Sequence, residues 1–391
     1  MSGDQPAPRQ RADRPGLSFA GIFAVTFCGL VAVGCVLPVL PRYVRGPLHE
    51  GDLAVGIVVG CYAITGLLLR PVAGRLADRR GRKPTVLVGA LLVAVSGLLY
   101  LPSLGIAGLI GARLVLGAGE GSLYTAGSAW VVDLAPPARR GRVLGLYGLA
   151  VWGGLSVGPL AGELLLEAGG YRAVWLFAAA MPLAGALIAT RVPDPFEPVT
   201  HSEPHPLIAP EAVRPGLAVA LASIGYAAVA AFIVLHLEAR GVGHGATVFA
   251  AFAAMIVLTR LVVGDLPDRV GAAPVAIGAT LGEAVGLLLI AVAHSLPVAL
   301  LGGLAMGAAF SLLNPSLMLI AVNRVSESAR GAAMGTFTAF FDAGVGFGAP
   351  LAGLVAALTD YEGAFVLAAA ISVGSAALIL ATLHRPASAR R

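Results

Sequence analysis

The sequence predicts an all-α integral membrane protein whose twelve transmembrane helices form two six-helix, pseudo-symmetric halves. Three observations carry this prediction: the composition, a succession of long apolar segments, and an internal repeat. Of 391 residues, 58% are hydrophobic and only 12% are charged, whereas a typical soluble domain has about 25% charged residues. Mean hydropathy is +0.87. This composition excludes an ordinary soluble enzyme, a disordered chain and a small disulfide-stapled secreted domain.

The apolar segments are long enough to cross a bilayer as helices, which takes about 20 mostly apolar residues. Residues 17–41, 143–162 and 364–383 carry no charge at all. The segments lack the period-two alternation of outer-membrane β-strands. When an occasional charge is allowed, the sequence predicts twelve spans, at residues 17–41, 52–73, 85–102, 105–132, 142–168, 172–191, 215–237, 246–264, 274–294, 297–322, 331–358 and 363–383.

The arginines predict how these spans are oriented. With both termini in the cytoplasm, 19 of the 26 cations lie on the cytoplasmic side and four lie outside, while Arg70, Arg113 and Arg260 fall within spans. Short cytoplasmic loops carry such an excess of cations. We therefore expect a multi-pass protein of the inner (cytoplasmic) membrane. The first 16 residues are polar and the following apolar run is too long for a signal peptide, so we expect no cleavage.

Other classes of site are not indicated. The formal charge of +5 is attributed to topology, because no basic face interleaved with aromatic residues predicts a nucleic-acid partner. Cys28, Cys35 and Cys61 all lie in predicted spans, where free apolar thiols are expected rather than a disulfide or metal framework. No Walker motif, zinc-ligand spacing or nucleophile elbow occurs. We expect no enzymatic activity, no cofactor and no bound metal.

The chain repeats itself at an offset of 190 residues. Residues 74–84 align without a gap on residues 264–274, and the same offset places Arg70 on Arg260. Two parallel repeats around an axis normal to the membrane are typical of a large class of transporters that bind substrate where the repeats meet. The predicted divisions are a cytoplasmic tail at 1–16, a six-helix bundle at 17–191, a cytoplasmic linker at 192–213, a second bundle at 214–384 and a cytoplasmic tail at 385–391.

Three motifs resemble those of the major facilitator superfamily (MFS). Residues 74–83 resemble its G-x-L-a-D-r-x-G-r-k signature between the second and third helices, with a degenerate copy at 264–271. Residues 113–119 are similar to the R-x-x-q-G-x-g element of the fourth helix. The g-x-x-x-G-P-x-x-G motif of the antiporter branch is matched by Gly154, Gly158, Pro159 and Gly162. The resemblance covers nearly the whole chain and extends to bacterial drug-efflux and sugar-efflux permeases.

The resemblance implies a gate in the loop after the second span. A topogenic basic loop would explain the cations around Asp78 but not the aspartate itself, nor its repeat Asp268. In the family this aspartate meets the N-terminus of the eleventh helix, here near Gly331, where free N–H groups favour an anion. That contact would hold the halves together inside while the cavity opens outside. The implied gate residues are Gly74, Asp78, Arg79, Gly81, Arg82, Asp268 and Arg269.

Four charged residues within spans are candidates for proton or substrate coupling. Arg113 must face the cavity or a partner, because a lone guanidinium in lipid costs at least about 2.5–3.5 kcal/mol. Glu120, two turns on, is the obvious partner, through a water or a substrate; a structural ion pair is the alternative. Asp342 lies in a glycine-rich span, and burial favours a carboxyl group that carries a proton; interhelical hydrogen bonding is its alternative. Glu163 either joins this group or lies at the outer surface.

Aromatic and small residues complete the expected cavity. Tyr124, Tyr147, Trp152 and Tyr226 are candidates to contact substrate, although most aromatic residues in membrane proteins pack or form interface belts. The glycines at 154, 158 and 162 form one stripe on the fifth span. We expect that stripe to pack closely against a helix of the other half, with Pro159 bending the span.

The sequence thus predicts a secondary active transporter that works by alternating access, as a proton-coupled antiporter exporting a small drug-like or sugar-like molecule. The expected partners are a small-molecule substrate, protons and the lipid bilayer, and the chain is expected to be a monomer. An importer or uniporter of a sugar or metabolite is the alternative within transport. No acid occurs in the first or seventh span, where several drug antiporters carry theirs. A transport-inactive sensor or scaffold of the same fold is the alternative from another class.

Overall fold

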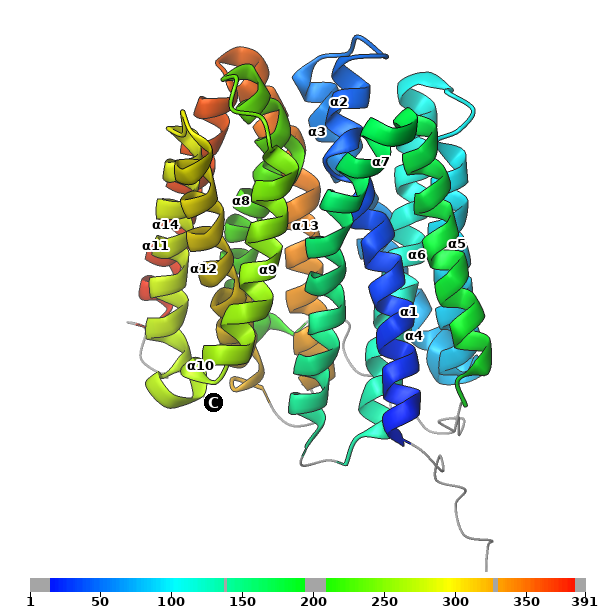
Figure 1. Cartoon of the computed structure of the whole chain (residues 1–391). Helices are drawn as coiled ribbons and strands as arrows, with labels where there is room; N and C mark the ends of the chain where they lie inside the picture. The colour runs from blue at the N-terminus through cyan, green and yellow to red at the C-terminus, as the bar shows by residue number, and fades with distance from the viewer. Residues whose placement is uncertain (1–14, 137–138, 194–208, 326–329, 384–391) are drawn as a thin grey trace, which may run out of the picture.

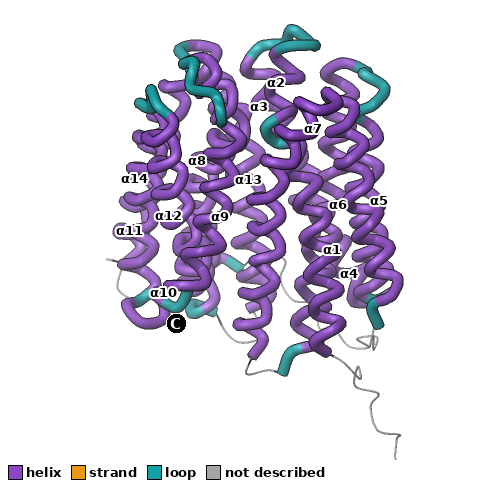
Figure 2. Tube along the Cα trace, in the orientation of Figure 1, coloured by secondary structure: helices purple, strands orange, loops and turns teal. Residues whose placement is uncertain are grey.

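The computed structural model describes residues 15–136, 139–193, 209–325 and 330–383. Residues 1–14 of the predicted N-terminal tail, most of the linker and the C-terminal tail lie outside these residues, and α1 begins two residues before the predicted start of the first span. The described chain is helical, and Figure 2 draws helices and loops but no strand in it. The helices are α1 (Pro15–Val36), α2 (Val39–Arg45), α3 (Asp52–Gly60), α4 (Tyr62–Arg80), α5 (Arg82–Leu99), α6 (Gly105–Leu134), α7 (Arg140–Arg191), α8 (Pro210–Ala239), α9 (Gly245–Val263), α10 (Leu266–Val270), α11 (Ala272–Ala291), α12 (Leu296–Val322), α13 (Arg330–Leu358) and α14 (Tyr361–Leu383).

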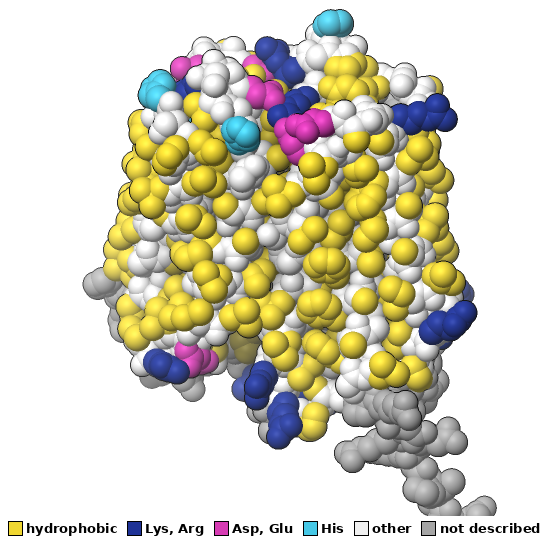
Figure 3. Space-filling view, in the orientation of Figure 1, with side chains coloured by type: hydrophobic (Ala, Val, Ile, Leu, Met, Phe, Trp, Pro, Cys, Tyr) yellow, Lys and Arg dark blue, Asp and Glu magenta, His cyan; other side chains and the backbone are white. Residues whose placement is uncertain are grey.

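Eleven described helical segments are long and apolar enough to cross a membrane. One of them, α7, has 52 residues and a break at Gly170 (φ 66°), so it consists of two successive spans. The prediction of twelve spans and an all-α membrane fold is confirmed. Figure 1 shows two groups of helices side by side, α1–α7 (the N-half) and α8–α14 (the C-half). In Figure 3 apolar side chains cover the middle of the molecule and charged ones gather towards its two ends.

We name the ends by the chain: α1 begins and α14 finishes at the termini end, at the bottom of Figure 1, and the α2–α3 connection lies at the opposite end. Two predicted spans are broken near their middle or end. α1 stops before Leu37 and Pro38, and α2 continues the first span to Arg45. α3 and α4 are separated by a single residue, Cys61.

The Gly74–Arg80 part of the signature motif is helical, although the sequence predicted a loop. It forms the last turns of α4, which runs seven residues beyond the predicted end of the span. Gly81 ends the helix with a φ of 106°, a conformation that glycine adopts without the steric penalty of a Cβ atom. Gly271, its repeat, ends α10 with a φ of 107°. The two halves therefore share this turn in backbone geometry as well as in sequence.

The two halves also share an equivalent close approach between helices. A Cβ atom on Gly117 would collide with the carbonyl oxygen of Tyr62, and one on Gly307 would collide with that of Phe252. Both pairs are related by the offset of 190 residues. In each half one helix, α6 or α12, rests its glycine on the backbone of a neighbour, which is the close approach that small residues allow in lipid.

Adding a methyl group at Gly117 is expected to destabilise the fold. Gly117→Ala must push α6 away from α4, at a cost of about 1–3 kcal/mol. A Cβ atom on Gly145 would meet nothing within 4 Å, so Gly145→Ala is the matched control and should gain up to about 1 kcal/mol in helix propensity. Thermal unfolding of the purified proteins in detergent, followed by tryptophan fluorescence, measures both. Equal unfolding temperatures for the two variants would contradict the packing argument.

The predicted partner of the glycine stripe on the fifth span is wrong. Gly154 and Gly158 face the backbone of α1 in the same half, around Val31 and Gly34. The backbones of the two halves instead approach each other at α3 and α13. A Cβ atom on Gly60 would lie 2.9 Å from the carbonyl oxygen of Gly346. The correction has a simple cause: helical periodicity identifies a small-residue face, but not which helix it meets.

Candidate functional site

A central cavity of about 280 Å³ lies between the two halves. Its walls come from α4, α6 and α7 of the N-half and from α9, α12 and α13 of the C-half. On every one of these helices the lining positions fall between the middle of the span and the termini end. The lining residues are Arg70, Glu120, Tyr124, Gly148, Val151, Trp152, Arg260, Phe310, Asn314, Pro315, Met318, Phe337, Thr338 and Phe341.

A two-pronged ion pair joins the halves beside this cavity. Arg70 on α4 donates from Nε to Asp342 on α13 over 2.6 Å and from Nη2 to the second carboxylate oxygen over 3.1 Å. The side chains are 17% and 8% exposed, respectively. Arg70 also lies 5.6 Å from the ring centre of Tyr124. Bidentate arginine–carboxylate pairs are among the stronger hydrogen-bonded contacts in proteins, so this pair holds α4 and α13 together at the middle of the molecule.

Two further charges line the cavity and have no partner among the described residues. Glu120 on α6 and Arg260 on α9 are both partly exposed to it. Within the described residues, neither side chain makes a hydrogen bond or ion pair. Arg260 reaches towards the other half, because a Cβ atom on Gly148 of α7 would lie 2.8 Å from its Nη1. The cavity therefore presents one acid and one base that are free to meet a ligand.

Arg113 does not face the cavity, and the predicted bridge to Glu120 is absent from the described structure. Its side chain is completely buried. It donates to the carbonyl oxygens of Val58 (3.0 Å) and Val59 (2.6 Å) and stacks on the ring of Tyr62. The last carbonyls of a helix lack intrahelical donors and carry partial negative charge. Because α3 ends at Gly60, these carbonyls need a donor, and Arg113 supplies it; the residue closes the break between α3 and α4.

The four predicted aromatic contacts separate into two groups. Tyr124 and Trp152 line the cavity. Tyr147 is completely buried and shares a 2.8 Å hydrogen bond with Thr26, so it packs within the N-half. Tyr226 lies behind the wall, with its ring centre 5.9 Å from that of Trp152 and 5.7 Å from that of Phe310. This aromatic cluster lies on the side of the cavity that faces the opposite end.

An ion pair and a hydrogen bond join the halves at the opposite end. Arg42 on α2 donates to Glu163 on α7 over 2.6 Å and also pairs with Glu238 on α8 of the C-half. Tyr361 on α14 donates to Asp52 on α3 over 2.9 Å. Glu163 was a predicted coupling residue; it lies in this polar cluster, well away from the cavity. Glu163 therefore lies near one end of the molecule and does not line the cavity.

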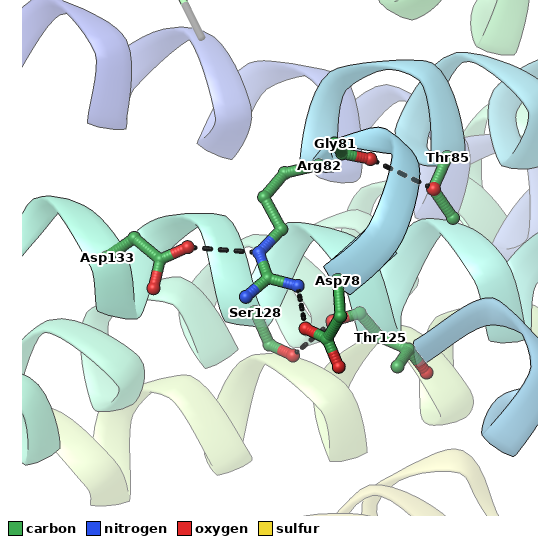
Figure 4. A network of polar contacts seen from close by, with 7 residues as sticks. All are labelled: Asp78, Gly81, Arg82, Thr85, Thr125, Ser128 and Asp133. Atoms are coloured by element: carbon green, nitrogen blue, oxygen red, sulfur yellow. Dashed lines mark hydrogen bonds and ion pairs between the residues drawn. The ribbon is translucent and has the colours of Figure 1, made fainter. Parts of the chain in front are cut away.

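Asp78 lies at the termini end, in a polar network confined to the N-half (Figure 4). It pairs with Arg82 one turn on, and Arg82 also donates to Asp133 over 3.0 Å. Thr85 donates to the carbonyl oxygen of Gly81 over 3.1 Å, which braces the turn between α4 and α5. Within the described residues Asp78 makes no hydrogen bond or ion pair with the beginning of α13 near Gly331.

The second copy of the signature differs in its pairing. Arg269 pairs with Asp265, which precedes α10, rather than with Asp268. Asp265 takes the place that Arg75 has in the first copy. The two turns are therefore alike in backbone geometry but differ in their salt bridges.

Sequence reasoning missed several polar residues at the interface between the halves. Arg70 and Arg260 were noticed as charges within spans and as repeats of each other, and these two signals together could have identified them. Arg42, Glu238, Asp52 and Tyr361 lie near the ends of spans, where polar residues are common, so nothing in their local sequence indicated that they meet. Asn314 and Phe310 had no signal beyond their place in an apolar span.

Comparisons with known proteins agree with this arrangement. The Major Facilitator Superfamily profile matches residues 22–266 and 216–391. An uncharacterized MFS-type transporter of Salmonella typhimurium is 34% identical over 366 residues, which are 92% of this chain and 94% of the relative. The fold resembles a crystal structure of a mutant of the nucleoside transporter NupG with a TM-score of 0.79 and 14% identity, over 93% of this chain and 99% of that one.

It also resembles a bacterial homolog of the human lysosomal transporter Spinster, in an inward-facing and occupied conformation, with a TM-score of 0.73 and 15% identity over 95% of this chain and 98% of that one. The helical architecture and the cavity between two halves define a multi-pass membrane transporter, a class that is not enzymatic. The chain belongs to the Major Facilitator Superfamily.

Proposed function

We propose that this protein is a proton-coupled antiporter that exports a small molecule by alternating access. One observation carries the proposal: a cavity with two charges that have no partner among the described residues lies towards the termini end, while an ion pair, a hydrogen bond and close helix packing join the halves at the other end. Protonation changes at a carboxyl group inside such a cavity provide a means of exchanging a proton for a substrate.

The orientation follows from the arginine count. The termini end corresponds to the cytoplasm, because most of the cations lie in its loops and tails. The described conformation is then inward-open, which is also the side to which the Spinster homolog faces in its crystal structure. Substrate would enter from the cytoplasm and reach the cavity beside Glu120.

The two carboxyl groups at the cavity have separate roles in this proposal. Glu120 releases a proton to the cytoplasm and binds substrate in its place. Asp342 is already neutralised by Arg70, and that pair keeps α4 and α13 together while the halves rock. Opening to the outside requires the separation of Arg42 from Glu238. A proton then displaces the substrate from Glu120 and the cycle returns.

The turn at Gly81, which ends the signature segment of α4, would act in the outward-open stage of the cycle. In the outward-open state the termini end must close, which brings the end of α4 towards the beginning of α13. Asp78 is exposed on α4 in the described conformation, with 46% of its side chain accessible, and could then meet the free N–H groups of α13. We assign this latch to Asp78, supported by the positive-φ glycine that ends its helix at Gly81.

Reconstituted vesicles test the proposal. Purified protein is placed in proteoliposomes that contain a pH-sensitive dye, and candidate substrates are added on one side under an opposing proton gradient. Antiport predicts that each transported compound moves protons in the opposite direction. Uptake of a compound together with protons would instead establish the importer alternative. Compounds that bind and change the conformation but never cross the membrane would establish the sensor alternative.

A further inference from the structure

The two unpaired charges of the cavity indicate what kind of substrate it takes. We propose that the substrate is amphoteric: a small molecule with a basic amine at one end for Glu120, an acidic group at the other end for Arg260, and a flat apolar body between them. The inference rests on the proposed function, because it assigns a ligand class to the same cavity. It starts from two side chains that line one cavity and have no protein partner among the described residues.

The internal repeat shows why Arg260 needs an anion. Arg70 and Arg260 occupy equivalent positions, and Arg70 pairs with Asp342. The position equivalent to Asp342 in the other half is residue 152, which is Trp152. Arg260 therefore lacks the carboxylate that its counterpart has. Arg260 is only partly exposed, and a guanidinium group with limited access to water is costly unless it is paired. An acidic group of the substrate can take the place that Asp342 takes beside Arg70.

Glu120 has the converse requirement. Arg70, which lines the same cavity from the N-half, already makes two hydrogen bonds to Asp342. The Glu120 carboxylate can therefore bind a proton or a cationic amine, since either one neutralises or balances its negative charge. A substrate amine and a proton then compete for one group, which is the competition that antiport requires.

The walls between these charges suit an aromatic or other flat apolar body. Trp152, Phe310 and Phe341 line the cavity together with Tyr124. Glu120 lies on α6 of the N-half and Arg260 on α9 of the C-half, and no ion pair joins them in the described structure. We therefore place the two complementary groups of the ligand at its opposite ends. The cavity volume of about 280 Å³ restricts the ligand to a small molecule.

Three related probes test the assignment by isothermal titration calorimetry on the purified full-length protein. The parent is para-(aminomethyl)benzoic acid, which has an amine and a carboxylate at opposite ends of one ring. Its methyl ester keeps only the amine, and its N-acetyl derivative keeps only the acid. The parent is expected to bind about tenfold tighter than either derivative, because each derivative lacks one charge-assisted contact.

Two variants assign the ends of the ligand. Glu120→Gln should weaken the parent and the ester about tenfold and leave the N-acetyl derivative unchanged, and Arg260→Gln should weaken the parent and the N-acetyl derivative but not the ester. Glu167→Gln and Arg172→Gln change exposed charges near Gly170, away from the cavity, and should leave all three affinities unchanged.

Equal affinity for the three probes, or no binding of any probe to folded protein, would overturn the amphoteric assignment. A preference for the ester over the parent would also overturn it, because the cavity would then select a cation alone. Binding of the parent with the expected variant pattern, but without proton movement in proteoliposomes, would support the substrate class and contradict antiport. The antiport proposal and the amphoteric-substrate proposal can therefore be contradicted independently of each other.

Discussion

Glu120→Gln is expected to lower proton-driven transport roughly 10- to 100-fold while the protein still folds and inserts. Glutamine has nearly the shape of the protonated acid but can neither release a proton nor attract an amine. The proton and the substrate therefore both lose the site that they share. The loss of one charge-assisted contact to the ligand accounts for the magnitude. Glu120 lines the cavity and has no protein partner in the described chain, so the substitution breaks no described ion pair.

Proteoliposome flux under an imposed proton gradient measures the effect, with thermal unfolding as the check on folding. Glu167→Gln is the matched control, because it makes the same chemical change at an exposed position away from the cavity. Asp342→Asn should give a different result: it leaves Arg70 unpaired and is expected to lower the unfolding temperature as well as the flux. Full proton coupling in Glu120→Gln would contradict the role assigned to Glu120.

Arg42→Gln is expected to increase the ratio of outward-open to inward-open protein about tenfold. Arg42 connects Glu163 of the N-half with Glu238 of the C-half, and it lies at the end that opens to the outside in the proposed cycle. A loss of about 1.4 kcal/mol from this closed end would shift the equilibrium by a factor of ten. Arg172→Gln is the matched control, because Arg172 is exposed at the same end and makes no hydrogen bond or ion pair within the described residues.

Spin-label distances across the opposite end measure this shift. Labels at Glu50→Cys and His244→Cys, both exposed and in different halves, report the separation, after the three native cysteines are replaced. A longer distance should gain population in Arg42→Gln and not in Arg172→Gln. An unchanged distance distribution in Arg42→Gln would exclude this ion pair as part of the closure.

Much of the fold follows from the sequence because the lipid bilayer imposes its requirement on each continuous stretch of sequence separately. Each crossing needs a run of apolar residues of set length with its backbone hydrogen bonds satisfied inside the helix, and hydropathy measures that directly. The helix bounds at α6, α12 and α13 agree with the predicted spans within two residues. The signature segment is where the prediction fails, because a helix can continue past the membrane until a residue such as Gly81 ends it.

The candidate site likewise has features that the sequence could predict and features that it could not. The acids Glu120 and Asp342 could be identified as unusual because ionised groups are costly in lipid wherever they occur along a span. The partners of these acids could not be identified from the sequence. Asp342 meets Arg70, 272 positions away in the chain, and Arg113 serves backbone carbonyls rather than Glu120. Pairing depends on the rotation and separation of helices, which no local pattern encodes.

The sequence by itself determined that this chain is a twelve-span membrane protein with an internal repeat and a few buried charges. Only the tertiary structure decided which of those charges are neutralised and which remain free. The reason is physical: apolar burial is summed residue by residue, whereas an ion pair depends on distances between helices that are far apart in the chain. Arg70 and Arg260 are equivalent in the repeat, but of these two only Arg70 lies against a carboxylate in the described structure.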